Sequence, residues 1–136
     1  MGVLIDTSVL VDLERGRLDA AALTEGRADE EMHVSVISAS ELLHGVHRAA
    51  TPEVRARRAA WVEGILAELP VLPLDILTAR THARLWADLA EAGTPIGAHD
   101  LWIAATAVAR GLTLLTRDVR AFKKLPGLAV EVTPAS

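Results

Sequence analysis

Short aliphatic runs, each long enough for one strand, alternate along the chain with longer segments of helical periodicity. The strand-like runs cover residues 3–5, 34–37, 71–74, 113–116 and 128–132. Strands that alternate with helices predict an α/β fold in which helices cover both faces of a parallel sheet. The run over 71–74 is expected at an edge of the sheet, because Pro73 cannot donate to a strand ladder.

Apolar residues spaced three and four positions apart predict the helices. These segments cover residues 8–15, 18–29, 52–69, 76–92 and 101–109, and a further helix is expected to open at the capping-box pattern Ser38-x-x-Glu41. Gly93 is expected to end the helix over 76–92 in the left-handed conformation. The segment over 101–109 is almost wholly apolar, so it should run through the middle of the domain.

Size and composition limit the possible classes of protein. The 136 residues fit one domain, 1–136, with 133–136 as a loose tail. No cysteine is present, which excludes disulfides, thiolate catalysis and cysteine metal sites. The chain shows neither a basic leader nor an apolar stretch of bilayer length, so we expect a cytoplasmic protein without membrane contact. The net charge of −4 argues against nucleic-acid binding by bulk electrostatics alone.

Four acidic residues follow an apolar run or open a predicted helix: Asp6, Glu41, Asp100 and Asp118. Ligands of open parallel sheets bind beyond the carboxyl ends of the strands, so we expect these four to meet at one end of the sheet. Each also has a purely structural explanation. Helix capping would account for Asp6, Glu41 and Asp100, and turn formation for Asp118.

A shared acidic site predicts a bound cation. Two carboxylates 4 Å apart repel by about 4 kcal/mol at an effective dielectric near 20. All-oxygen ligands favour Mg²⁺, or Mn²⁺, over zinc. The neighbouring hydroxyls of Thr7, Ser8 and Thr116 are expected to orient carboxylates or water, because no histidine base is paired with them.

Three further residues are candidates for substrate contact. His99 adjoins Asp100, although consecutive side chains on a helix point about 100° apart. Arg117 and Lys123 lie near Asp118. Their positive charge would guide a phosphate-bearing substrate into an acidic site that otherwise repels it.

Four motifs, in this order and spacing, carry a resemblance that extends over essentially the whole chain. They are V-L-I-D-T-S-V-L around Asp6, S-A-S-E-L around Glu41, H-D-L-W-I-A-A-T-A around Asp100 and L-L-T-R-D ending at Asp118. Together they resemble the PIN-domain ribonucleases, and among these the VapC toxins of type II toxin–antitoxin modules.

The resemblance implies a three-layer sandwich of helices around a five-stranded, twisted parallel sheet. It also implies a Mg²⁺-dependent endoribonuclease in which Asp6 and Asp100 are the principal metal ligands, Glu41 and Asp118 complete the set, and metal-activated water attacks the phosphate. The implied partners are RNA, a second copy in a homodimer, and a VapB-type antitoxin that covers the active site.

Two other classes of function remain compatible with the residues. A phosphatase or a DNA-directed nuclease would use the same acidic site. A non-catalytic regulatory or scaffold domain would use the acids only as caps and turn residues.

Overall fold

A five-stranded parallel sheet forms the centre of the computed structural model, which describes residues 2–133. The strand order is β3-β2-β1-β4-β5. The strands are β1 (Gly2–Ile5), β2 (Glu31–Ser35), β3 (Val71–Leu72), β4 (Thr113–Thr116) and β5 (Val130–Val132). The edge position expected for the third strand is confirmed.

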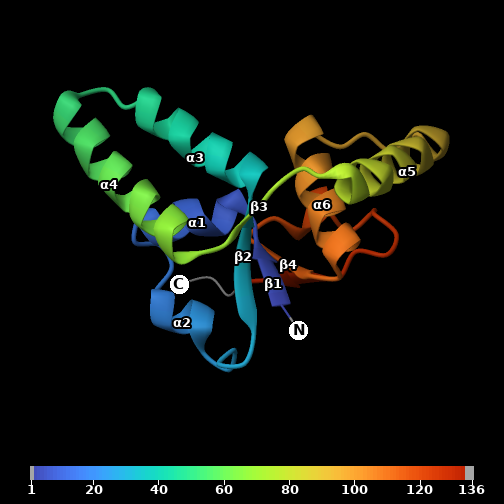
Figure 1. The fold of residues 1–136 in the computed structure, drawn as a ribbon, viewed down its shortest axis with the longest axis horizontal. Helices are drawn as coiled ribbons and strands as arrows, with labels where there is room; N and C mark the ends of the chain where they lie inside the picture. The colour runs from blue at the N-terminus through green and yellow to red at the C-terminus, as the bar shows by residue number, and fades with distance from the viewer. Residues whose placement is uncertain (1, 134–136) are drawn as a thin grey trace.

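Helices cover both faces of the sheet, with α1 to α4 on one side and α5 and α6 on the other (Figure 1). They are α1 (Thr7–Glu14), α2 (Ala20–Thr24), α3 (Val36–His47), α4 (Pro52–Glu68), α5 (Ile76–Ala92) and α6 (Ala98–Arg110), with a short 3₁₀ helix, η1 (Val119–Ala121), after β4. The predicted three-layer α/β fold is therefore confirmed. No helix within residues 2–133 is long and apolar enough to cross a membrane.

Alternation along the two central strands builds a core on each face of the sheet. Successive side chains of a strand point to opposite faces. Leu4 of β1 and Leu114 of β4 accordingly pack with α5 and α6. Their neighbours Ile5 and Leu115 pack with α1 to α4, and all four side chains are buried.

The order of the strands reverses beside β1. From β1 the chain passes to β2 and then to β3 on one side, whereas β4 and β5 lie on the other side. Ligands of open α/β sheets bind at this kind of switch point, beyond the carboxyl ends of the strands. Asp6 follows β1 there, and its amide donates to the Leu115 carbonyl of β4 at 2.9 Å.

The start of α3 differs from the prediction. The strand expected over 34–37 ends at Ser35, and α3 begins directly at Val36. The Ser35 hydroxyl caps this helix by accepting from the Ser38 amide at 3.0 Å. The helix start expected at Ser38 is therefore wrong, and Glu41 lies in the second turn rather than in a capping box.

The strands expected over 71–74 and 128–132 are shorter than predicted, and two larger differences concern the second helix and the C-terminal segment. The helix expected over 18–29 is only Ala20–Thr24, because Asp19 caps its start and Gly26 adopts a left-handed φ of 74° soon after its end. Thr133, placed in the expected tail, is buried, and its amide donates to the Thr116 carbonyl at 3.0 Å. The rest of that tail, 134–136, lies outside the described residues.

Candidate active site

A cavity of about 410 Å³ opens where β1 and β4 end, and all four predicted acids line it. Its other walls come from α1 and from the segment around η1. The lining residues are Asp6, Thr7, Ser8, Val11, Asp12, Glu41, Asp100, Arg117, Asp118, Ala121 and Phe122. Parallel pairing and the β1/β4 switch thus bring together residues separated by more than a hundred positions.

Asp6 is the most deeply buried of the four acids, with 6% of its surface exposed. Its Oδ2 atom accepts hydrogen bonds from the Ser8 hydroxyl at 2.7 Å and the Thr116 hydroxyl at 2.8 Å. Asp6 occupies the N-cap position of α1, yet its side chain makes no capping hydrogen bond. Helix capping therefore does not account for this carboxylate.

The turn after β4 fixes the two hydroxyls that hold Asp6. The Arg117 amide donates to Ser8 Oγ at 3.1 Å, and the Asp118 amide donates to Thr116 Oγ1 at 3.1 Å. Each hydroxyl therefore accepts from the turn and donates to the carboxylate. The carboxylate is held by side chains whose own orientation is set by the backbone.

Burial raises the pKa of Asp6 above its ordinary value, and the charge of Glu41 raises it further. Hydrogen bonds from Ser8 and Thr116, together with one from the Thr7 backbone, act in the opposite direction because they favour the ionised form. Burial therefore disfavours the ionised form of Asp6, and the hydrogen bonds offset only part of this effect.

Glu41 is fixed by a chain of hydroxyls that begins at the α3 N-cap. Thr7 Oγ1 lies 2.7 Å from Glu41 Oε1 and 2.8 Å from Ser38 Oγ, and Ser38 in turn lies 3.4 Å from Ser35 Oγ. A hydroxyl has one proton, so Thr7 donates to the carboxylate and accepts from Ser38. The other Glu41 oxygen, Oε2, lies 3.5 Å from Nδ1 of the exposed His99.

Asp100 lies in the first turn of α6, after the N-cap Gly97. Its pKa is raised first by burial and then by the carboxylates of Asp6, Glu41 and Asp118, while His99 opposes the shift. Asp100 therefore senses the charges of the other three acids. A cation that entered the cavity would relieve this repulsion.

Asp118 makes the turn interaction that was its structural alternative. It is exposed, and its Oδ1 accepts from the Arg120 amide at 3.2 Å at the start of η1. It also lines the cavity, so one oxygen serves the turn while the carboxylate remains at the site.

Of the two basic residues predicted to contact the substrate, one lines the acidic cavity and the other does not. Arg117 lines the cavity with its Nε 2.6 Å from Asp12 Oδ2, whereas the exposed Lys123 does not line it. Instead, Arg120 and Lys124 line an adjoining cavity of about 190 Å³ together with Asp100.

Asp12 is the site residue that sequence reasoning missed. It is 9% exposed, and it lies four residues after Ser8 on α1, so both side chains share one face of the helix. The sequence could have indicated Asp12, because it is a charged residue within the apolar run Val9-Leu-Val-Asp-Leu13.

Within residues 2–133, no group of three or more His, Asp or Glu side chains stands at the spacing needed to hold a metal ion. Mg²⁺ commonly binds through one or two protein carboxylates and completes its coordination with water and substrate phosphate. The all-oxygen donors and the mutual repulsion of Asp6, Glu41 and Asp100 therefore fit this ion, without a closed protein cage.

Comparisons with known proteins show the family and the fold of the chain. The family model described as "PIN domain" matches residues 3–128. Ribonuclease VapC1 of Rickettsia felis is 38% identical over 131 residues, which cover 96% of this chain and 95% of that protein. The tRNA(fMet)-specific endonuclease VapC of Salmonella typhimurium is 38% identical over 100 residues, 74% of each chain. The crystal structure of DNA-bound VapBC from Salmonella typhimurium contains a chain that is 30% identical, with a TM-score of 0.85 over 98% of this chain and 99% of that one.

Proposed function

Because the chain belongs to the PIN-domain family and, within it, to the VapC ribonucleases, we propose that Asp6, Glu41, Asp100 and Asp118 form its RNA-cleaving site. The observation that carries this proposal is the shared cavity at the carboxyl ends of β1 and β4. The raised pKa of Asp100, caused by burial and by the carboxylates of Asp6, Glu41 and Asp118, supports it because Asp100 lies close enough to sense the other three charges.

The metal proposed for this site is Mg²⁺, with Mn²⁺ as a substitute, and Asp6 and Asp100 are its principal ligands. A carboxylate offers about four acceptor positions, and the two hydroxyl bonds at Oδ2 of Asp6 leave capacity for a cation. When bound, the ion neutralises charge that develops on the phosphate and lowers the pKa of water.

The other residues of the chain hold the site and admit the substrate. Ser8 and Thr116 fix Asp6, and Thr7 fixes Glu41 where it can accept a proton from water or hold it in place. Asp118 completes the acidic rim. Arg117, which is held by Asp12 at the wall of the cavity, contributes positive charge to draw in a phosphate group.

We further propose that the chain acts as the toxin of a type II toxin–antitoxin module in the cytoplasm. One relative is the tRNA(fMet)-specific endonuclease VapC of Salmonella typhimurium, and a VapBC complex of the same organism has been solved bound to DNA. By analogy, the partners of this chain are an RNA substrate, a VapB-type antitoxin that covers the acidic cavity, and a second copy in a homodimer.

The test of the reaction compares three substrates in Mg²⁺: single-stranded RNA, single-stranded DNA of the same sequence, and a phosphomonoester. We expect cleavage of the RNA alone. Equal or faster reaction with DNA or the phosphomonoester would replace the ribonuclease assignment with that of a DNA nuclease or phosphatase. No reaction with any of the three would favour a non-catalytic role for the acids.

A further inference from the structure

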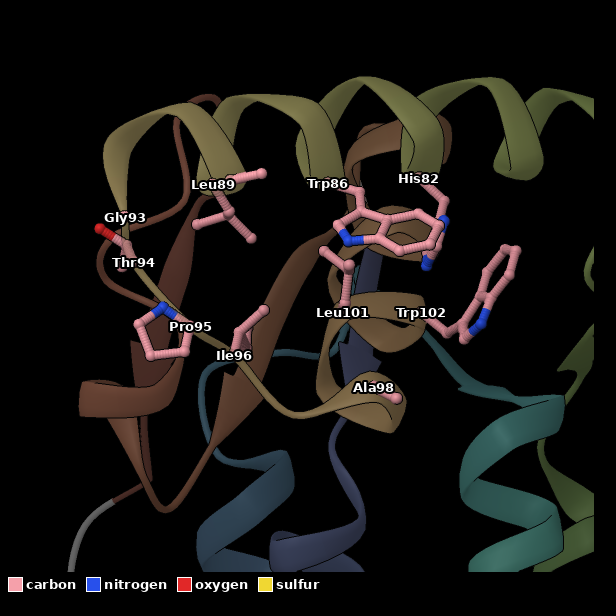
Figure 2. A pocket seen from close by; sticks show the side chains of 11 residues that line it. His82, Trp86, Leu89, Gly93, Thr94, Pro95, Ile96, Ala98, Leu101 and Trp102 are labelled. Carbon is pink, nitrogen blue, oxygen red and sulfur yellow. The ribbon is translucent and has the colours of Figure 1, made fainter.

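A second cavity, of about 560 Å³, lies between α5, the start of α6 and the loop that joins them. Figure 2 shows His82 and Trp86 projecting from α5 toward Leu101 and Trp102 of α6. The loop residues Pro95 and Ile96 form the opposite wall (Figure 2). The cavity is distinct from the acidic one, because the two share no lining residue.

Aromatic rings dominate one side of this cavity. The His82 ring stacks on Trp102 with a centroid distance of 3.6 Å and an interplanar angle of 15°. Trp86 meets the same His82 ring by its edge, at 5.8 Å and 63°. Trp86 remains 62% exposed, an unusual degree for a large aromatic side chain. Its ring is therefore held by an edge contact while much of its surface stays open to a ligand.

The chemistry of the cavity suits a neutral, flat and apolar group. Among residues 2–133, no Asp, Glu, Lys or Arg side chain lines it. His82 is the one titratable side chain among the described residues that line it, and burial lowers the pKa of that ring, so it is neutral at physiological pH. A phosphate group has no positive partner here, whereas a nucleobase offers a π-face for stacking and polar edges for His82 and Thr94.

A basic cavity joins this aromatic cavity to the acidic site. It shares four lining residues with the aromatic cavity: Leu89, Thr94, Pro95 and Ile96. It shares Asp100 and Ala121 with the acidic cavity, and Arg120 and Lys124 also line it. Acidic, basic and aromatic cavities therefore lie in a row along this side of the molecule.

We propose that the aromatic cavity is a base-binding subsite, in which a base of single-stranded RNA near the cleaved phosphate stacks on Trp86. The RNA backbone then passes Arg120 and Lys124 on its way to the acidic site. Positive side chains beside an aromatic stacking platform are what proteins use to hold single-stranded nucleic acid. This inference rests on the ribonuclease function proposed above and adds a substrate-binding residue to it.

The test uses a 12-nucleotide single-stranded RNA that the parent protein cleaves, and a series of the same RNA with one base at a time removed. We expect Trp86→Ala to raise KM by about 5- to 150-fold with a smaller effect on kcat, as for loss of one stacked base. Trp86→Phe should retain most of the affinity. Trp86→Leu, which keeps apolar bulk without a π-face, should resemble Trp86→Ala.

The base-deleted RNAs identify the stacked position. One of them should bind the parent as weakly as intact RNA binds Trp86→Ala, and the substitution should cause no further loss with that RNA. Binding is measured by fluorescence anisotropy in an Asp6→Asn background, so the readout does not depend on cleavage. Arg120→Gln and Lys124→Gln should each weaken binding and reduce its salt dependence, while Arg57→Gln on the distant α4 should not.

Three outcomes would overturn the subsite. Trp86→Leu could bind RNA as well as the parent. The Trp86→Ala defect could persist with every base-deleted RNA. Alternatively, Trp86→Ala could leave RNA binding unchanged while it lowers the sedimenting mass or the retention of an antitoxin, which would identify a protein-binding face. A parent protein that cleaves no RNA would instead refute the proposed function itself.

Discussion

The Thr116 hydroxyl donates a 2.8 Å hydrogen bond to Asp6 Oδ2 and thereby joins the ends of β4 and β1 across 110 residues of sequence. The bond lies at the switch point of the sheet, where the site is open to ligand. Its acceptor is a buried carboxylate, and its donor also receives the Asp118 amide. One threonine thus connects a metal-ligand candidate to the turn that carries another acid.

Thr116→Val should lower kcat/KM for RNA about tenfold or more, because it removes a charge-assisted bond worth about 1.5–3 kcal/mol. The remaining bond from Ser8 should keep Asp6 in place, so the protein should still fold. Thr113→Val serves as the control, since Thr113 lies at the opposite end of the same strand. A Thr116→Val protein as active as the parent would show that this bond does not position Asp6 for catalysis.

Thr7→Val should weaken the site through Glu41. The substitution removes the donor 2.7 Å from Glu41 Oε1 and leaves the Ser38 hydroxyl without its acceptor. We expect the free energy of unfolding to fall by about 1–2 kcal/mol, together with a several-fold loss of kcat/KM. Thr7→Ser keeps the hydroxyl and should restore both quantities, as measured by chemical denaturation and RNA cleavage. Equal loss in Thr7→Ser would point to packing of the methyl group instead.

Asp100→Asn should stabilise the metal-free protein at neutral pH. Burial and the neighbouring carboxylates raise the pKa of Asp100 above its ordinary value of 3.8, so the folded state binds this proton more tightly than the unfolded state. The free energy of unfolding contributed by this group therefore decreases as the pH rises from about 3.8 through the folded-state pKa, and stays low above it.

Thermal unfolding in EDTA measures this effect. The Tm difference between Asp100→Asn and the parent should be small at pH 4 and reach a few degrees in favour of the variant at pH 7.5. Asp88→Asn, which changes an exposed carboxylate on α5, should show no such trend. A destabilised Asp100→Asn protein at pH 7.5 would mean that this carboxylate supports the metal-free fold rather than opposing it.

Asp12→Asn should destabilise the protein by about 1–3 kcal/mol, because Asp12 accepts a charge-assisted contact of 2.6 Å from Arg117 Nε. Loss of that anchor should also weaken RNA binding, since Arg117 forms part of the cavity wall. Denaturant unfolding and anisotropy check the two effects. Asp29→Asn, an exposed change elsewhere, is the matched control. Unchanged stability would show that the ion pair is replaced by water at no cost.

Periodicity located most of the fold because long amphipathic segments carry a strong signal. The helix over 76–92 and its Gly93 cap were predicted at their observed positions. The segment over 18–29 was not, because its alanines favour a helix while only Leu23 within the observed α2 is buried. A short helix depends on tertiary packing, which propensity does not describe.

The candidate site was also predicted only in part, because some of its contacts depend on long-range packing. The four acids could be grouped in advance, because parallel strands bring their carboxyl ends to one edge. The Ser38-x-x-Glu41 pattern predicted the wrong helix start, because Ser35 caps α3 three residues earlier. The Asp12 contact with Arg117 depends on how α1 packs beside β4, and neither residue reveals the other in the sequence.

The central claim is that Asp6 and Asp100 hold the ion on which RNA cleavage depends. The most direct measurement is kcat/KM for RNA as Mg²⁺ is raised, in the parent, Asp6→Asn, Asp100→Asn and the Asp88→Asn control, with folding verified by circular dichroism. We predict that the parent and the control saturate with Mg²⁺, while each site variant loses at least about a hundredfold in rate, comparable to removal of one major electrostatic contribution. Asp6→Asn and Asp100→Asn proteins that are folded and cleave RNA at the parent rate, with the parent dependence on Mg²⁺, would contradict the account.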